Sequence, residues 1–367
     1  MWEPGTLLQF VIRFPTLTHL KIEFDNYGNI STHEILELFR GLPQLEDIHI
    51  DASAFQSVAE EYSDQFGVVD LPRLHNIHSS WTTPRSQYNL LAYIEYPPTC
   101  SVSLQAKQRG AFQPLLNPFP ESWDAFFLQD LFSVTLRMER GMYSTKCAVI
   151  VKKVNGASIS VSHFKNFLGR SSDRDRDDNR VFSAAISQIK ELPLHLIEVF
   201  VLEDLRTEYM FAPGSFEIPP GLIKLICSDL SHLKTLALTR TRVSELFGIL
   251  TPPPPPPPMN TADPFEERGT SESNLPCPAL KVLEVRHPDW KPTAHFSEAL
   301  ALANARKSKG VPFERVLFQS FDPPESIAKR MPSYVDDVDI KCCPCNYCFR
   351  RGTGRRGHKE KRCPNRY

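Results

Sequence analysis

The stretch Ser231-His-Leu-Lys-Thr-Leu-Ala-Leu-Thr239 decides which fold the sequence predicts. Leu233, Leu236 and Leu238 follow the spacing L-x-x-L-x-L within it. Because successive side chains of a strand point to opposite faces, Leu236 and Leu238 would lie on one face, and Leu233 would close the turn that leads into the strand. The stretch therefore predicts one short strand with a buried face.

Similar spacings recur along the chain, and this repetition makes the signal informative. One cycle of strand, turn, helix and next strand takes about 28 residues, within the roughly 20 to 29 of a leucine-rich repeat. We expect an α/β fold over residues 1–340, a leucine-rich-repeat-like solenoid with short parallel strands and irregular helices. The further triplets are Leu17, Leu20 and Ile22; Leu45, Ile48 and Ile50; Leu196, Val199 and Val201; Leu280, Leu283 and Val285; Phe313, Val316 and Phe318; and Val335, Val338 and Ile340.

Other elements are expected between these repeats. Ile35, Leu36, Leu38 and Phe39 would share one face of a helix that ends before Gly41. The polar stretch 171–180 is expected to be an exposed loop, because it contains nothing to bury. Helices are further expected at 88–96, 181–192, 218–226, 243–250 and 297–307, and strands at 134–138, 147–154 and 157–163, where the repeat rhythm weakens.

A proline-rich insertion interrupts the repeats at 251–274. It contains the uninterrupted run Pro252 to Pro258. Proline lacks a backbone N–H and has a fixed φ, so neither an α-helix nor a central strand accommodates such a run. We expect a projecting loop in the polyproline II conformation. It would either dock into an aromatic groove of a partner or be a neutral expansion within a tolerant loop.

The overall composition predicts an intracellular protein without a membrane segment. Lys plus Arg number 42 and Asp plus Glu 43, so the net charge gives no argument for nucleic acid or membrane binding. Residues 1–14 lack a secretory signal pattern, and no apolar run approaches the roughly 18 to 20 residues that span a bilayer. We expect a cytoplasmic or nuclear location, with Cys100, Cys147, Cys227 and Cys277 as reduced thiols.

The sequence offers no positive sign of an enzyme. It contains no phosphate-binding Gly-rich loop, no nucleophile elbow, no HExxH motif and no EF-hand loop. We therefore expect a protein that is not an enzyme and needs no cofactor. The histidines, among them His19, His49, His75, His78 and His195, are interpreted as surface or hydrogen-bonded core residues.

The segment 341–367 is a basic, cysteine-rich tail that we expect to be disordered. Cys345, Cys348, His358 and Cys363 include a C-x-x-C pair and could hold zinc as a Cys3His site. The spacing from Cys348 to His358 is longer than in a zinc knuckle, and three glycines loosen the segment. The alternative is a disordered tail whose cysteines bind no metal.

The same tail carries a run of positive charge that is opposed only by Glu360. Such a run could bind nucleic acid or act as a nuclear localisation signal, and the alternative is a solvated basic tail. The cationic residues are Arg350, Arg351, Arg355, Arg356, Lys359, Lys361, Arg362 and Arg366.

The chain resembles fungal, mushroom-type F-box proteins with degenerate leucine-rich repeats. The resemblance rests on FPTLTHLKIEF, LPQLEDIHIDAS, LSHLKTLALT, CPALKVLEVRHPDW and, above all, ALANARKSKGVPFERVLFQ, and it covers most of residues 14–340. In that family an N-terminal F-box binds the adaptor of a cullin-RING ubiquitin ligase, and the repeats bind a substrate. An F-box would precede the first repeat, and we expect it to be absent because there is no room for it before Leu17.

The resulting expectation is a non-enzymatic protein-binding module that resembles the substrate-recognition part of an F-box receptor. Its protein partner is not identified by the sequence, and the ligase adaptor would be a partner only if an upstream F-box exists. The alternative function is a nucleic-acid-associated protein that acts through the basic Cys/His tail 341–367.

Overall fold

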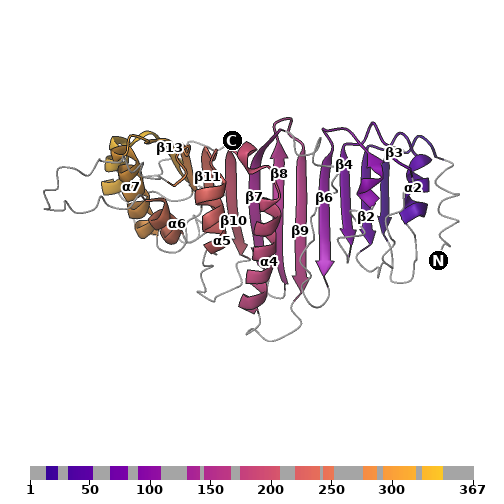
Figure 1. The fold of residues 1–367 in the computed structure, drawn as a ribbon, viewed down its shortest axis with the longest axis horizontal. Coiled ribbons are helices and arrows are strands. Elements are labelled where there is room, and N and C mark those ends of the chain that lie inside the picture. The colour runs from indigo at the N-terminus through magenta and orange to yellow at the C-terminus, as the bar shows by residue number, and fades with distance from the viewer. Residues whose placement is uncertain are drawn as a thin grey trace, which may run out of the picture. The chain divides into compact units, whose positions relative to one another are not determined.

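The computed structural model describes residues 14–23, 32–52, 67–81, 90–108, 130–140, 144–166, 174–206, 220–239, 243–251, 276–286, 292–319 and 325–341. The chain divides into two compact units. Unit 1 comprises Met1–Ile197 and Glu203–Ala212, and unit 2 comprises Glu198–Leu202 and Pro213–Tyr367. Both units are mixed α/β and are built on open, mostly parallel sheets (Figure 1).

The strands of unit 1 follow one another in the sheet order β1, β2, β4, β6, β9, β8, β7. The pairs from β1 to β9 are parallel, whereas β8 pairs antiparallel with both β9 and β7. A separate parallel pair is formed by β3 and β5. The strand bounds are β1 His19–Glu23, β2 Asp47–Ala52, β3 Val69–Asp70, β4 Asn76–Trp81, β5 Ile94–Glu95, β6 Ser101–Gln108, β7 Leu131–Arg140, β8 Ser144–Lys153 and β9 Ser158–Asn166.

The helices of unit 1 supply apolar faces to its core. In α2 (Thr32–Arg40), the predicted residues Ile35, Leu36, Leu38 and Phe39 are all fully buried. The longer helix α4 (Arg174–Lys190) lies against β8 (Figure 1). A single 3-10 turn, η4 (Leu194–Leu196), follows it. The antiparallel β7, β8 and β9 occupy the region where the repeat rhythm weakens, because successive hairpin strands need no helical crossover.

Unit 2 continues with strands in the order β11, β12, β13, β14, all paired in parallel. Strand β10 (Val199–Arg206) is divided between the two units. Helices α6 and α7 pack against each other (Figure 1). The remaining bounds are β11 Thr235–Thr239, β12 Val282–Arg286, β13 Phe313–Gln319, β14 Val335–Lys341, α5 Pro220–Lys224, the π-helical turn η5 Leu225–Asp229, α6 Val243–Leu250, α7 Pro292–Ser308, α8 Glu325–Arg330 and the 3-10 turn η6 Met331–Ser333.

The same turn precedes one strand after another. A backbone N–H just before the strand donates to the carbonyl three residues earlier, which reverses the chain and satisfies both groups. At the start of several strands, two successive N–H groups then share one carbonyl that lies just before the neighbouring strand, as Lys234 and Thr235 share that of Glu198. The turn bonds run from Leu17 to Phe14, Leu45 to Leu42, Leu74 to Leu71, Cys100 to Pro97, Ile197 to Leu194, Leu233 to Leu230 and Leu280 to Cys277.

In unit 2, the strand residues that follow the spacing L-x-x-L-x-L are the ones that form the core. Leu236, Leu283 and Val316 are opposite one another in the registers of β11, β12 and β13, and all three are fully buried. Side chains aligned in this way pack directly across neighbouring strands. The predicted strands at 233–238, 280–285, 313–318 and 335–340 are therefore present.

One predicted repeat has the wrong phase. The sequence prediction placed Leu196, Val199 and Val201 toward the core, but the buried residues are Ile197, Phe200 and Leu202, one position later in each case. A shift of one residue moves every side chain of a strand to the other face. The turn before β10 gives the same correction, because Ile197 bonds to Leu194 as Leu233 does to Leu230.

Two local predictions in unit 1 were also wrong. The stretch 171–180 was expected to be a loop, yet α4 already begins at Arg174. Polar residues indicate exposure but do not exclude a helix, and Arg is a good helix former. The helix expected over 88–96 is interrupted, since Ile94 and Glu95 form β5 beside β3.

The predicted insertion and tail lie almost entirely outside the described residues. Strand β14 ends at Lys341, where the tail was expected to begin. Thr251 is the one described residue of the insertion 251–274, and of the tail 341–367 only Lys341 is described.

Candidate protein-binding surface

The two faces of the strands in unit 2 differ in character. One face is apolar and packs on helices: the ring of Phe318 in β13 meets that of Phe296 in α7 edge to face, with 4.8 Å between the ring centroids. Because strand side chains alternate, the residues between the buried positions point away from this core. They include five charged residues that we call the charged face: Glu284, Arg286, Arg315, Asp337 and Asp339.

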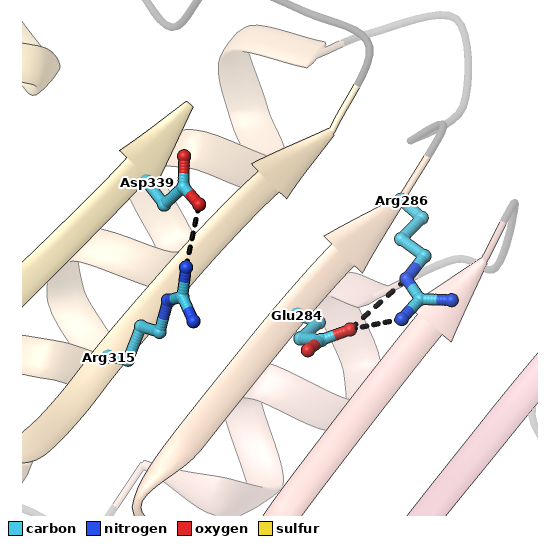
Figure 2. Close-up of polar contacts among 4 residues, drawn as sticks. All are labelled: Glu284, Arg286, Arg315 and Asp339. Carbon is cyan, nitrogen blue, oxygen red and sulfur yellow. Dashed lines mark hydrogen bonds and ion pairs between the residues drawn. The ribbon is translucent and has the colours of Figure 1, made fainter. Parts of the chain in front are cut away.

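Ion pairs fix the side chains of the charged face. Arg315 of β13 binds two carboxylates of β14, with Nη2 2.7 Å from Oδ2 of Asp339 and Nε 3.3 Å from Oδ2 of Asp337. On β12, the guanidinium of Arg286 contacts the carboxylate of Glu284, with Nε 3.1 Å from Oε2 (Figure 2). Both arginines are therefore held in defined orientations by neighbours on the sheet.

An apolar centre lies between these charges. Leu317 is opposite Glu284 on one side and Asp339 on the other in the strand register. It belongs to the outward row of β13, yet only 7% of it is exposed. The row continues onto β11 with Ala237, which is opposite Glu284 and 1% exposed. Charged side chains thus surround the small or apolar residues Ala237 and Leu317 on this face of the sheet and cover them.

The charged face carries both signs of charge. Three carboxylates and two guanidinium groups leave it with a small negative balance. The side chains of Arg286 and Arg315 remain 36% and 43% exposed, so both are accessible to a partner. Arginine is enriched at protein interfaces because its planar guanidinium forms directed hydrogen bonds and also stacks.

In unit 1 the outward residues of the first strands are polar and include three predicted surface or core histidines. His19 pairs with Asp47 at 2.8 Å, and Asp47 also accepts a 2.5 Å hydrogen bond from Asn76. His49 and His78 are opposite each other and stack, with 4.5 Å between their ring centroids. The side chain of His19 is 68% exposed, which fits the surface interpretation for that residue.

A different histidine, His163 of β9, is buried beneath α4. Its Nε2 lies 2.8 Å from the amide nitrogen of Gln188 in that helix. An amide nitrogen can only donate, so this ring nitrogen accepts and the imidazole is neutral. Burial lowers the pKa of His163 to about 4. The pair ties α4 to the sheet, and we assign it to the core.

The residues predicted as a zinc site belong to the tail 341–367. Cys345, Cys348, His358 and Cys363 lie outside the described residues, as do the basic cluster of the tail and the run Pro252 to Pro258. The zinc site therefore stays a prediction. Within the described ranges, no cluster of three or more His, Cys, Asp or Glu side chains is arranged to hold a metal ion.

The sequence interpretation did not single out the charged face. Its residues stand at the outward positions of V-L-E-V-R, F-E-R-V-L-F-Q and V-D-D-V-D-I-K. Alternation predicts that they point outward, but which charges meet depends on the register between strands whose paired residues are 33 (β12 and β13) or 22 (β13 and β14) positions apart in the chain.

Across the part of the chain that the structure describes, no helix combines the length and apolar composition needed to cross a membrane. Comparison with known proteins gives no match, either to a family model or to a curated protein.

Proposed function

We propose that the chain is a non-enzymatic protein-binding module and that the charged face contacts its partner. The observation that carries this proposal is the set of oriented ion pairs on the side of β12, β13 and β14 that faces away from the core. Figure 2 shows four of these side chains, Glu284, Arg286, Arg315 and Asp339, on the side of the strands opposite the helices.

Stability alone gives little reason for such a cluster. Exposed ion pairs contribute about 0 to 1 kcal/mol each, because water screens the charges and the side chains lose freedom. The core beneath the charged face is already complete, with Leu283 and Val316 fully buried. Recognition of a partner accounts for the orientation of the arginines better than folding does.

The mixed signs favour a protein as the partner of this face. A surface that binds nucleic acid gains its affinity by neutralising phosphates with Lys and Arg. Asp337, Asp339 and Glu284 would repel phosphates here. A protein that offers both acidic and basic side chains would complement the charged face.

We also propose that the parallel strands are successive turns of a leucine-rich-repeat-like solenoid. The recurring turn before the strands and the aligned core residues support this reading. Solenoids offer one continuous surface for binding. The resemblance to F-box proteins supports the narrower proposal that this surface derives from the substrate-binding part of a ubiquitin-ligase receptor, which would work in the cytoplasm or the nucleus.

The test is to tag the chain at its native locus and to compare its co-purifying proteins with those of two variants. The first combines Arg286→Gln with Arg315→Gln and removes the two cations of the charged face. The control combines Lys309→Gln with Arg330→Gln, which are exposed, belong to the same unit and change the net charge equally.

The proposal expects a protein that the wild-type chain and the control retain and that the charged-face variant loses at least tenfold. If all three chains retain the same proteins in the same amounts, the charged face is not the binding surface. Recovery of a cullin-RING ligase adaptor together with a product heavier than 41.8 kDa would support an upstream F-box. Absence of the adaptor would leave a stand-alone binding module.

A further inference from the structure

Two cysteines that are far apart in the sequence meet in unit 2. Cys227 lies in η5 and is partly exposed, whereas Cys277 lies in the turn before β12 and is 1% exposed. The Sγ atom of Cys277 is 3.0 Å from the carbonyl oxygen of Ile226, the residue directly before Cys227. Cys277 therefore lies against the turn that carries Cys227.

The position of Cys277 departs from the repeat. The carbonyl of Cys277 accepts the N–H of Leu280, as the carbonyl of the equivalent residue does in the turns before other strands. In the turns before β2, β4, β10 and β11 that residue is Leu42, Leu71, Leu194 and Leu230. An apolar side chain serves this position elsewhere, so packing alone does not call for a thiol here. Cys227 likewise belongs to a π-helical turn, a local departure from α-helix that is frequent at functional sites.

The surroundings give the two thiols different properties. The neighbouring Cys277 lowers the pKa of Cys227, whereas the neighbouring Cys227 and burial raise the pKa of Cys277. The buried guanidinium of Arg306 donates to the carbonyl oxygen of Cys277 at 3.2 Å, which places a positive charge beside the pair. A partly exposed cysteine of lowered pKa next to a buried cysteine of raised pKa is the arrangement in which one cysteine reacts and its neighbour resolves the product.

We propose that Cys227 and Cys277 are a redox-active pair that closes to a disulfide when a peroxide oxidises Cys227. The thiolate sulfur of Cys227 attacks one peroxide oxygen, the O–O bond breaks, and the other oxygen leaves with a proton as water or an alcohol. Cys227 then carries a sulfenic acid. The sulfur of Cys277 attacks this sulfur, the S–O bond breaks, and the hydroxide leaves as water with the proton of Cys277. Two thiols are oxidised and one peroxide is reduced.

The disulfide would join η5 to the turn before β12. It would close a loop over residues 228–276, which includes the run Pro252 to Pro258. The closed loop would also contain β11 and α6. The other described cysteines provide contrast, since Cys100 and Cys147 are fully buried and burial raises the pKa of Cys100 to about 12.

The test uses the purified full-length chain and hydrogen peroxide. After treatment, free thiols are blocked with N-ethylmaleimide, the protein is digested without reduction, and cross-linked peptides are identified by mass spectrometry. The proposal expects a peptide pair that contains Cys227 and Cys277, with a mass about 2 Da below the sum of the two reduced peptides. Before oxidation, Cys227 should be alkylated at least tenfold faster than Cys100 and Cys147.

Two variants complete the design. Cys227→Ser is partly exposed and should fold, and it should lose the cross-link. Cys277→Ala should leave Cys227 as a sulfenic acid that dimedone traps; if this variant does not fold, the wild-type peptide map decides alone. The proposal is overturned if Cys277 remains fully alkylated by N-ethylmaleimide while Cys227 is oxidised to sulfinic acid or is joined to a cysteine of the tail.

Discussion

At the scale of single residues, His163 makes the stability of unit 1 depend on pH. The pKa of its buried imidazole is about 4 in the folded chain, whereas an unfolded histidine has a pKa of about 6.5. Between these values the unfolded state binds more protons, so the free energy of unfolding falls as the pH is lowered. The stabilisation is fully present above about pH 6.5 and decreases by about 1.4 kcal/mol per pH unit within the window.

We predict a loss of about 2 kcal/mol in the free energy of unfolding between pH 7 and pH 5 that depends on His163. Urea unfolding of His163→Gln should show a pH dependence weaker by this amount, whatever its stability at pH 7. His75→Gln is the control, because His75 is exposed and belongs to the same unit. An equal pH dependence of the free energy of unfolding in wild type and His163→Gln would show that His163 does not cause it.

Arg306 is a charged residue that is fully buried in unit 2. Its guanidinium donates to the carbonyl oxygens of Pro276, Cys277 and Leu280 at 2.9 to 3.2 Å and lies 5.0 Å from the ring centroid of Phe313. These bonds hold the turn before β12 against α7. The arginine thus replaces the backbone donors that this proline-containing turn lacks.

Replacing Arg306 with alanine should lower the free energy of unfolding by about 2 to 4 kcal/mol, because it opens a cavity and leaves buried carbonyls without this donor. The matched control is Lys309→Ala, an exposed cation three residues further along the chain, which should change stability by less than about 0.5 kcal/mol. Urea midpoints compare the two variants directly. Similar midpoints for both would show that the turn does not depend on Arg306.

At the scale of elements, the sequence predicted the positions of the strands better than it predicted which residues of each strand face the core. The L-x-x-L-x-L spacing located β1, β2 and β10 to β14, since alternating burial leaves a trace in any strand with one face in the core. It failed on the phase of β10, where neighbouring apolar residues allow either set of alternating positions to face the core. The structure buries Phe200 and leaves Val201 partly exposed.

This corrected phase of β10 can be tested with two substitutions. Phe200→Ala should cost about 3 to 5 kcal/mol because it opens a cavity in the core. Val201→Ala, on the adjacent and partly exposed residue, should cost less than about 1 kcal/mol. The free energies of unfolding from urea titrations give the comparison. A larger loss for Val201→Ala would restore the phase that the sequence suggested.

The candidate binding surface was less accessible to sequence reasoning than the strands were. Glu284, Arg315 and Asp339 belong to three strands, β12, β13 and β14, and only the parallel register brings them to one face. The 17-residue helix α7 separates two of these strands, so no local pattern connects their charges. The predicted zinc ligands of the tail, in contrast, form a local pattern, and they stay a prediction.

At the scale of the whole molecule, the buried core provides the stability, and the charged face is proposed to provide the recognition of a partner. The charged-face variant with Arg286→Gln and Arg315→Gln should retain the free energy of unfolding of the wild type to within about 1 kcal/mol, as expected for exposed ion pairs. Circular dichroism and urea unfolding check this expectation. A much larger loss would mean that the ion pairs maintain the sheet, and binding data from that variant would then report on folding.

The most direct test of the central claim is the protection of arginines when the partner is bound. The chain, alone and with the protein recovered by co-purification, would be labelled with an arginine-selective dicarbonyl reagent and the sites quantified by mass spectrometry. The account predicts that the partner slows labelling of Arg286 and Arg315 at least fivefold and leaves the exposed Arg330 unchanged. Equal labelling of Arg286 and Arg315 with and without the partner would contradict it.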